Sequence, residues 1–407
     1  MPLMDNLHYL LQKASSNSNK NLEILSNFFS QEEKQLLTQR SVSIVGTNGK
    51  TSTATVLNEL LSRNGLSTIL FTSPHLVNVN ERIQIKKEII KDIDLDRGME
   101  KVRVFEDKNK ITLGYFESIF LIAATYFLNN NLDIFIVEAG IGGRLDTTSI
   151  LNSQIVCLTN IGLDHTELLG TTIEEILHEK ILVSKNVKQF INGSAEIHTK
   201  YEHLIKESLK LKNEDYHLGF KDDEYVNSSS IVRTNYLKSN QSNAIKVSKV
   251  ILGNLNKTDN FNNDPLYLEN IKKMKTEGRF QVIQNLPSLK IIDGAHNPSG
   301  IKAFFDLLEY SYNIGDVNNF DCYVGFNKNK DYREMLKTIW LKRYLNIKVL
   351  EDGSFFKQQK TYTLEKFFIA NNKDIQKSTL KEFHLSNKPS ILLGSLYLIG
   401  EYIKEYK

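Results

Sequence analysis

A glycine-rich turn at residues 46–52 carries the sharpest chemical signal in this sequence. It reads GTNGKTS, follows the apolar run SVSIV and precedes an amphipathic stretch, so we expect a strand, a tight turn and a helix. Glycines let backbone N–H groups point at phosphate oxygens, and a helix N-terminus adds positive potential. A lysine can reach the outer phosphates, and a hydroxyl can hold Mg²⁺. We therefore predict a nucleotide phosphate site built by Gly46, Thr47, Asn48, Gly49, Lys50, Thr51 and Ser52.

The turn departs from the common phosphate-loop pattern GxxxxGK[ST], because Ile44 stands where the first glycine would be. An ordinary glycine-rich turn between a strand and a helix is the alternative. The strand, the Gly-Lys pair and the helix together favour a phosphate site.

Polar side chains follow three further apolar runs. Ser73 and His75 come after STILF, Glu138 comes directly after IFIV, and His165 lies just past QIVCL. Ligands of an open parallel sheet bind at the carboxyl ends of its strands, so we expect these groups to gather there. A carboxylate, a histidine and a hydroxyl suit an Mg²⁺ ion that also contacts ATP phosphates. Hydrogen bonds that cap loops are the alternative for Glu138 and His165.

Lys180 lies on the apolar stripe of a predicted helix, three and four residues after Leu177 and Ile176. Apolar neighbours disfavour the charged form of a lysine, and a neutral amine can react with CO₂ to give an anionic carbamate. Spacing alone favours the alternative, in which the ammonium group runs out to solvent along its stem.

A second polar turn follows the apolar run LKII and reads DGAHNP. It places Asp293 and His296 at the end of a predicted strand, with Pro298 in the first turn of a helix. Upstream, Arg279 could bind a phosphate through two hydrogen bonds. An Asx turn and a surface charge are the alternatives.

These groups need a scaffold of alternating strands and helices, and the apolar periodicity predicts one. The fold class is α/β: a P-loop-type, mostly parallel sheet domain and a smaller C-terminal α/β domain. We place the domains at residues 1–276 and 277–407, and expect 213–239 to be irregular. The main predicted strands lie at 41–47, 67–73, 133–140, 154–161, 290–296, 321–326, 347–350 and 389–395, and the helices at 51–64, 113–129, 171–187, 241–252, 299–310 and 332–344.

The composition narrows the class of protein. The chain has 407 residues, and 51 basic against 48 acidic side chains leave a net charge of +3, which argues against a nucleic-acid-binding protein. No run approaches the roughly 18 apolar residues of a membrane helix. The two cysteines, Cys157 and Cys322, lie in apolar runs and are expected in the core. We expect a cytoplasmic enzyme.

The order of these motifs resembles the folylpolyglutamate synthase/dihydrofolate synthase family of the Mur ligase superfamily. The matching segments are GTNGKTST, TSPHL, NERI, EAGIGGRLD, LDHTELLG, HEK, EGRF, DGAHNP and LLGSLYLIGE. The resemblance implies an ATP-dependent amide ligase. It would phosphorylate the carboxylate of dihydropteroate or a reduced folate and join L-glutamate to it through an acyl phosphate.

The resemblance also implies roles for single residues. Ser73, Glu138 and His165 would bind Mg²⁺, and a carbamylated Lys180 would face the metal. A K⁺ or a second Mg²⁺ is left open. Catalysis would rest on Lys50, Lys180, His165 and Arg279. Asn243, Arg279, Asp293 and His296 would contact ATP, and Phe116 and Asp146 would lie near the pterin.

Three questions stay open at this stage. The family loop usually reads GTNGKGS, whereas Thr51 here matches the wall-building Mur ligases. A Mur-type ligase acting on a peptidoglycan precursor is therefore the main alternative, against which only about forty residues precede the loop. A generic P-loop switch or kinase would leave EGRF and DGAHNP without a role. The sequence does not decide between the two folate reactions, and the family suggests a monomer.

Overall fold

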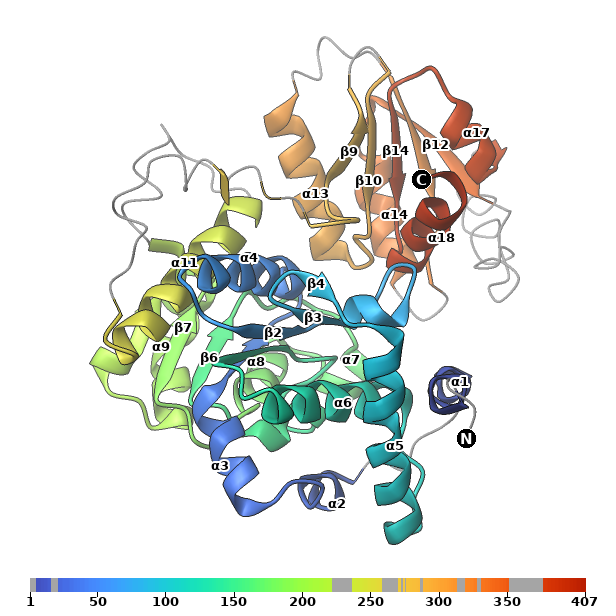
Figure 1. Cartoon of the computed structure of the whole chain (residues 1–407). Coiled ribbons are helices and arrows are strands. Elements are labelled where there is room, and N and C mark those ends of the chain that lie inside the picture. Colours follow the sequence, from blue (N-terminus) through green and yellow to red (C-terminus); the bar gives the residue numbers. More distant parts are fainter. Residues whose placement is uncertain are drawn as a thin grey trace. The chain divides into compact units, whose positions relative to one another are not determined.

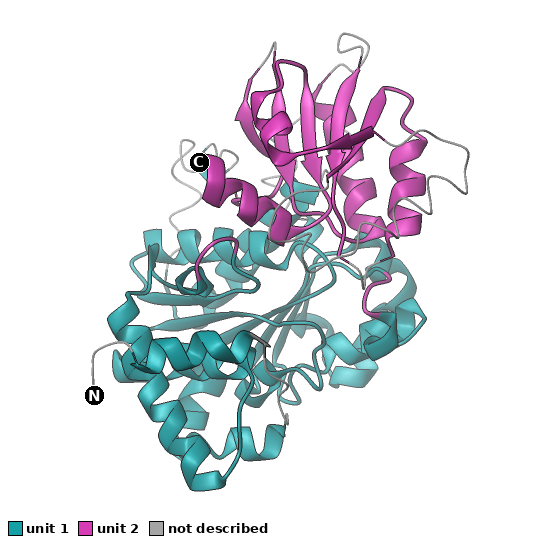
Figure 2. Ribbon diagram, turned by 90° about the vertical axis from the view of Figure 1, so that its right-hand side faces the viewer, with its two compact units in different colours: residues 1–75, 79–162, 166–274 teal, residues 76–78, 163–165, 275–407 magenta. Residues whose placement is uncertain are grey.

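The computed structural model describes residues 5–15, 21–221, 236–257, 270–271, 274, 276–285, 288–312, 319–327, 331–350 and 376–407. The chain forms two compact units, which are coloured separately in Figure 2. Unit 1 comprises Met1–His75, Val79–Gly162 and Thr166–Met274, and unit 2 comprises Leu76–Asn78, Leu163–His165 and Lys275–Lys407. Each unit is an α/β layer structure, which confirms the predicted fold class.

Unit 1 is built on a sheet that, within the described residues, has eight strands in the order β4-β3-β2-β5-β1-β6-β7-β8. The neighbours in the run β2-β5-β1-β6-β7-β8 are parallel, whereas β3 pairs antiparallel with both β2 and β4. Its strands are β1 (Ser41–Val45), β2 (Thr68–Phe71), β3 (Ile83–Ile85), β4 (Glu88–Ile89), β5 (Ile134–Glu138), β6 (Ile155–Leu158), β7 (Gln189–Asn192) and β8 (Tyr216–Leu218).

Helices cover both faces of this sheet (Figure 1). Alternate residues of each strand point to opposite faces, so the fully buried strands feed two apolar layers. Ile134 and Ile136 of β5 pack in the layer of α4 and α11, whereas Phe135 and Val137 pack in the layer of α5 and α6. The helices of unit 1 are α1 (Asp5–Gln12), α2 (Leu22–Ser26), α3 (Gln31–Arg40), α4 (Lys50–Arg63), α5 (Asp92–Asn109), α6 (Tyr115–Asn129), α7 (Thr166–Leu169), α8 (Ile173–Ile181), α9 (Ala195–Leu209) and α11 (Tyr236–Asn254).

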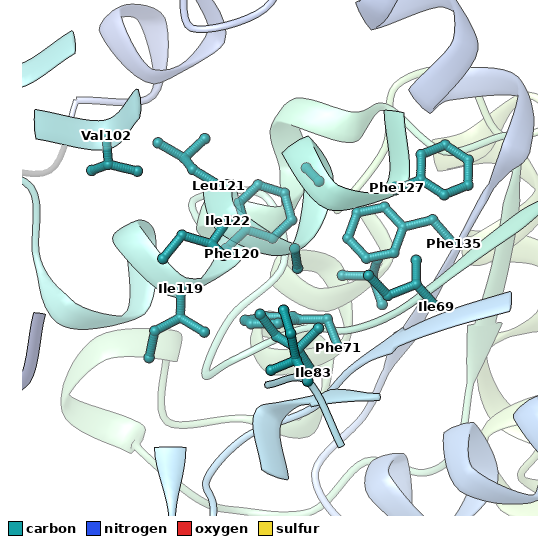
Figure 3. Packing of buried hydrophobic residues seen from close by; sticks show 14 of the residues in the cluster. Ile69, Phe71, Ile83, Val102, Ile119, Phe120, Leu121, Ile122, Phe127 and Phe135 are labelled. Atoms are coloured by element: carbon teal, nitrogen blue, oxygen red, sulfur yellow. The ribbon is translucent and has the colours of Figure 1, made fainter. Parts of the chain in front are cut away.

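Aromatic rings fill the layer between the sheet and α6. Phe120 of α6 stacks on Phe135 of β5 with ring centroids 6.3 Å apart, and Phe71 meets Phe120 edge to face at 5.6 Å. Figure 3 shows these rings with Phe127 and Ile69 in one apolar cluster. This packing fixes the ends of β2 and β5, from which the polar side chains of the site extend.

Unit 2 has a smaller sheet of six strands in its described part, in the order β13-β12-β11-β14-β10-β9. All neighbours are parallel except β9 and β10. Cys322 and Cys157 are fully buried in their sheets, as predicted, and burial raises the pKa of Cys157 to about 12. The elements of unit 2 are β9 (Gln281–Gln284), β10 (Lys290–Asp293), α13 (Pro298–Ser311), β11 (Phe320–Val324), α14 (Tyr332–Trp340), β12 (Leu345–Leu350), β13 (Gln376–Ser378), α17 (Leu380–Leu385), β14 (Ser390–Leu393) and α18 (Leu396–Tyr406).

The sequence located the central elements well and the peripheral ones poorly. The helix predicted at 171–187 ends at Ile181, because the chain turns there and the N–H of Val183 bonds to the carbonyl of Lys180. The expectation that 213–239 is irregular was wrong in part. Tyr216–Leu218 forms strand β8, and α11 begins at Tyr236.

Candidate functional site

The glycine-rich turn joins β1 to α4, as predicted. Gly49 is the N-cap residue of α4 with a φ of +85°, and it offers no side chain to cap the first amides of the helix. Uncapped amides at a helix N-terminus form an anion site. Gly46 has a φ of +146°, and a Cβ atom there would lie 2.0 Å from Oγ1 of Thr159. Only glycine fits both positions.

The turn is held by the segment that follows β6. The N–H of Thr47 donates to the carbonyl of Asn160 at 2.9 Å, and the N–H of Asn48 donates to the Asn160 side chain at 2.8 Å. The ammonium group of Lys50 donates to the carbonyls of Gly46 and Thr47 at 3.0 and 3.2 Å. The ammonium group of Lys50 therefore lies against the backbone of the turn.

Three of the predicted polar groups meet at the end of β5. Glu138 is 2% exposed, and the hydroxyl of Thr51 lies 2.9 and 3.0 Å from its two carboxylate oxygens. The backbone N–H of Ser73 donates to the same carboxylate at 3.2 Å. Oxygen ligands of this kind are the ones that Mg²⁺ prefers, so the donor set fits the ion. Ser52, the other candidate hydroxyl, is buried on the inner side of α4.

His165 belongs to unit 2, where its backbone N–H donates to the Asp164 side chain at 3.0 Å. Its participation in a metal site with Glu138 stays a prediction. In the described part of the chain, no three His, Cys, Asp or Glu side chains are grouped so that they could hold a metal ion. Of the possible Mg²⁺ ligands Thr51, Ser73 and Glu138, only Glu138 is a carboxylate. The other protein ligands from this group would have to be hydroxyl groups.

Phe116 and Asp146 lie together around Gly140, two residues past the end of β5. Asp146 accepts a hydrogen bond from the N–H of Gly140 at 3.1 Å through Oδ2. A Cβ atom on Gly140 would lie 3.1 Å from the ring of Phe116. The second carboxylate oxygen of Asp146 accepts from the N–H and the hydroxyl of Thr148 at 3.0 and 2.8 Å. The two residues predicted near the pterin therefore share one corner of unit 1.

Lys180 is 4% exposed and does not run out to solvent. It lies in the last turn of α8, between Ile176 and Ile181 of the apolar layer. Its ammonium group donates to the carbonyl of Ile141 at 2.8 Å. The amine is therefore directed at the segment between Glu138 and Asp146.

Asn243 is fully buried in α11, and neither its amide nitrogen nor its carbonyl oxygen has a hydrogen-bond partner among the described residues. Buried polar groups are nearly always satisfied, so this amide is an exception within the described part of the chain. One turn earlier, Asn240 lies against Gly49 of the glycine-rich turn and has an equally unsatisfied amide nitrogen. Asn240 was not predicted, although its i−3 position relative to Asn243 places both on one helix face.

Unit 2 brings its own predicted residues together at the end of β10. Asp293 accepts from the N–H of Phe280 at 2.6 Å and from the N–H of Ala295 at 2.7 Å. The side chain of Arg279 lies beside Gly294, and the His296 ring bonds to the carbonyl of Gly294 at 2.8 Å. Pro298 opens α13, as predicted, and the side chain of Asn297 caps this helix. Asp293 thus fixes the backbone on both sides of the strand end, at Phe280 next to Arg279 and at Ala295 next to His296.

His75 follows Ser73 but makes a different set of contacts. Its Nδ1 atom accepts a hydrogen bond from Nε of Arg82 at 3.0 Å, and the Arg82 guanidinium lies 5.2 Å from the ring centre of Tyr115. Burial and the positive charge of Arg82 lower the pKa of His75 to about 4, against the opposing charge of Glu81. A neutral His75 thus orients Arg82 over the ring of Tyr115, an arrangement that no local sequence pattern predicts.

Comparison with known proteins identifies the superfamily to which the chain belongs, and then the family within it. Residues 44–261 match the Mur ligase middle domain, more than half of the chain. Within that superfamily, the chain is 30% identical over 377 residues to the dihydrofolate synthase/folylpolyglutamate synthase of Buchnera aphidicola subsp. Acyrthosiphon pisum, an alignment that covers 89% of this chain and 88% of the relative. The Bacillus subtilis protein of the same name is 27% identical over 74% of each chain.

The chain belongs to the dihydrofolate synthase/folylpolyglutamate synthase family, and it is an ATP-dependent ligase. These relatives favour the folate enzymes over the peptidoglycan ligases. Solved structures agree on the fold. The Yersinia pestis enzyme complexed with AMPPNP and an Mn ion superimposes with a TM-score of 0.76 at 22% identity, covering 99% of this chain and 98% of that one. The Escherichia coli FolC complex with ADP has a TM-score of 0.77 at 22% identity, covering 98% and 96%.

Among the described helices, none is long and apolar enough to cross a membrane.

Proposed function

We propose that this chain joins L-glutamate to dihydropteroate, to a reduced folate or to both, with ATP as the phosphoryl donor. The main observation behind the proposal is that the end of β5 lies beside both the glycine-rich turn and the residues predicted to bind the pterin. Glu138 bonds to Thr51 of the phosphate turn, and Gly140, two residues on, contacts Phe116 and Asp146. The terminal phosphate of a nucleotide and the acid group of a pterin substrate would therefore meet at this strand end. An Escherichia coli relative has been solved with DHPP and ADP.

The proposed reaction has two steps. A carboxylate oxygen of the substrate attacks the γ-phosphorus of ATP, and the bond from this phosphorus to the β,γ-bridging oxygen breaks. ADP departs, and the substrate becomes an acyl phosphate. The amine of glutamate then attacks the acyl carbon, phosphate leaves and the new amide nitrogen loses a proton. Lys50 and the amides of the phosphate turn would hold the phosphates against the incoming carboxylate. Mg²⁺, when bound near Glu138, would neutralise part of the repulsion between the two anions.

We assign the nucleotide contacts to Asn243 and the newly found Asn240 in unit 1, and to Arg279, Asp293 and His296 in unit 2. The unsatisfied amides of the two asparagines support the first assignment. The second rests on the family resemblance and on the way Asp293 organises its turn.

We further propose that Lys180 reacts with CO₂ to form a carbamate. The burial of its amine and its direction toward the segment after Glu138 support this assignment. Assaying Lys180→Ala with and without added bicarbonate tests it. Full turnover of this variant would remove the carbamate from the mechanism.

The function is tested by incubating the protein with ATP, glutamate and either dihydropteroate or tetrahydrofolate. We expect ADP release that requires both glutamate and the pterin, with a glutamylated product seen by mass spectrometry. Turnover only with UDP-muramoyl substrates would support the peptidoglycan ligase instead. ATP hydrolysis indifferent to every acid substrate would support a nucleotide switch.

We also infer a monomeric cytoplasmic enzyme. The use of ATP and the two buried free thiols support the compartment. Light scattering after size exclusion would test the monomer.

A further inference from the structure

The segment from Gly140 to Asp146 connects the two halves of the proposed site in unit 1. Near its start, the carbonyl of Ile141 accepts a hydrogen bond from the Lys180 ammonium group at 2.8 Å. Its last residue, Asp146, bonds back to the N–H of Gly140 at 3.1 Å beside the ring of Phe116. The position of this segment therefore sets where the pterin pocket lies relative to Lys180.

We propose that Glu179 is the positioning residue that holds this segment in place for the acid substrate. The assignment rests on the function proposed above. Glu179 lies in the last turn of α8, directly before Lys180. Its carboxylate bonds to Arg144 and Leu145 of the segment, so it would act through the segment that it binds.

Three hydrogen bonds join Glu179 to the segment. Its carboxylate accepts from Nε of Arg144 at 3.1 Å and from the backbone N–H of Leu145 at 3.0 Å. Its backbone carbonyl accepts from the N–H of Arg144 at 2.8 Å. The Glu179 side chain is 11% exposed, so its charge is largely shielded from solvent, whereas Arg144 is 54% exposed. The bond to the Leu145 amide fixes the backbone one residue before Asp146.

Close backbone packing makes this anchor sensitive to small movements. A Cβ atom on Gly143 would lie 2.5 Å from the carbonyl of Glu179 and 2.4 Å from that of Lys180. The segment thus lies directly on the last turn of α8. A shift of that turn would move the Lys180 amine and the segment together, and Glu179 keeps the two in register.

The residue type itself is unusual at this position. A carboxylate in the last turn of a helix faces the negative end of the helix dipole, where cationic side chains are favoured. A glutamate here weakens α8 unless its contacts compensate. Its hydrogen bonds to Arg144 and Leu145 provide that compensation, which supports a role beyond helix formation.

The test compares Glu179→Leu, Glu179→Gln and the control Glu174→Gln, an exposed residue of the same helix. We expect Glu179→Leu to raise the KM for dihydropteroate about tenfold, because both hydrogen bonds of the carboxylate to the segment are lost, and to change the KM for ATP less than about twofold. Glu179→Gln keeps an acceptor for the Leu145 amide and should recover most of the affinity. Glu174→Gln should match the wild type. Parallel rises of both KM values, or no change in either, would overturn the proposal.

A second readout needs no substrate. Hydrogen–deuterium exchange of residues 140–146 should speed up in Glu179→Leu and stay near the wild-type rate in Glu179→Gln, because the Leu145 amide loses its acceptor only in the first. Arg144→Gln, at a largely exposed position, provides a variant that should fold and show a smaller change in the same direction. If wild-type protein fails to use any pterin, the proposed function falls, whereas unaltered exchange in Glu179→Leu rejects the anchor alone.

Discussion

The hydroxyl of Thr51 lies 2.9 Å from Oε2 of Glu138, which joins the first turn of α4 to the end of β5. The register of the sheet brings the two residues close together, because Ile44 of β1 pairs with Glu138 of β5 and the two strands are parallel. The glycine-rich turn begins at Gly46, two residues past Ile44. The contact places the only carboxylate of the proposed metal set beside the first helical hydroxyl.

Glu138→Gln should lower kcat by roughly 100-fold while the protein stays folded, because the amide keeps the hydrogen bond from Thr51 but loses the negative charge that would hold a divalent cation. Turnover with dihydropteroate and the affinity for Mn²⁺ in the presence of ADP, followed by electron paramagnetic resonance, provide the measurement. Thr51→Ser retains the hydroxyl and is the matched control, which should stay close to wild type. Unchanged Mn²⁺ affinity in Glu138→Gln would speak against the carboxylate as a metal ligand.

Gly49→Ala should abolish nucleotide binding, because its φ of +85° costs a non-glycine residue ~1–2 kcal/mol and the new Cβ atom would lie 2.3 Å from Asn240. Gly65→Ala is the control for strain alone, since Gly65 has a φ of +77° with nothing within 4 Å of its Cβ position. Both variants should lower the melting temperature, and only Gly49→Ala should lose binding of a fluorescent ATP analogue. Equal affinity in the two variants would contradict a phosphate role for the turn.

The sequence predicted the parts of the fold that local patterns specify. The run SVSIV, the glycines after it and the amphipathic stretch behind them gave β1 and α4 to within two residues at each element's end. By contrast, β3 and β8 have three residues each, so they carry no periodicity and exist through pairing with distant strands. Helix α5 was missed because its many charged residues obscure the buried stripe around Leu95 and Met99.

The candidate site divides in a similar way. Glu138 could be predicted because it ends an apolar strand, and the edge of a parallel sheet is where ligands bind. Asn243 came only from the family resemblance, since one asparagine in a helix has no pattern of its own. The contacts of Arg82 with His75 and Tyr115, and of Glu179 with Leu145, depend on how loops close in three dimensions.

Asn243→Ala should raise the Kd for ATP about tenfold, or about 1.4 kcal/mol, while changing the free energy of unfolding little. Its amide is buried without partners among the described residues, so removing it relieves a desolvation penalty that offsets the small cavity. Ser248→Ala is the control, because the Ser248 hydroxyl is also buried and unsatisfied on α11. Calorimetric titration with ATP and thermal unfolding give both quantities. If Ser248→Ala weakened ATP binding equally, the effect would belong to the helix and not to Asn243.

Acid should destabilise unit 1 through His217 of β8. Burial first, and the nearby Lys246 second, lower the pKa of His217 from 6.5, with Asp215 acting in the opposite direction. The fold therefore prefers the neutral ring, whose contribution to stability is complete above pH 6.5 and is lost as the pH falls toward the lowered pKa. The stability of wild type relative to His217→Gln should thus fall between about pH 7.5 and pH 5.

Urea unfolding at a series of pH values measures this difference. His203→Gln is the matched control, because the side chain of His203 on α9 is 94% exposed and is solvated in the folded protein. The stability of that variant relative to wild type should stay level over the same range. A level curve for His217→Gln would remove this residue from the acid response.

Lys13→Met should be the most destabilising of these changes. Lys13 and Glu106 form a buried ion pair with Nζ 2.6 Å from Oε1, and their side chains are 3% and 4% exposed. The lysine also donates to the carbonyl of Leu113 at 2.8 Å, and the N–H of Leu113 donates to Glu106 at 2.5 Å. Removing the cation leaves a buried carboxylate without its counter-charge, which costs about 3–5 kcal/mol.

The exposed pair Lys200–Glu196 on α9 provides the comparison, with a similar distance of 2.8 Å but side chains that are 59% and 72% exposed. Lys200→Met should cost less than about 1 kcal/mol, because water screens that pair. The double variant Lys13→Met/Glu106→Gln should recover part of the loss, since it leaves no buried charge behind. Urea unfolding of the three variants decides the matter. A loss in Lys13→Met as small as that in Lys200→Met would mean that the attachment of residues 5–15 to α5 does not depend on this ion pair.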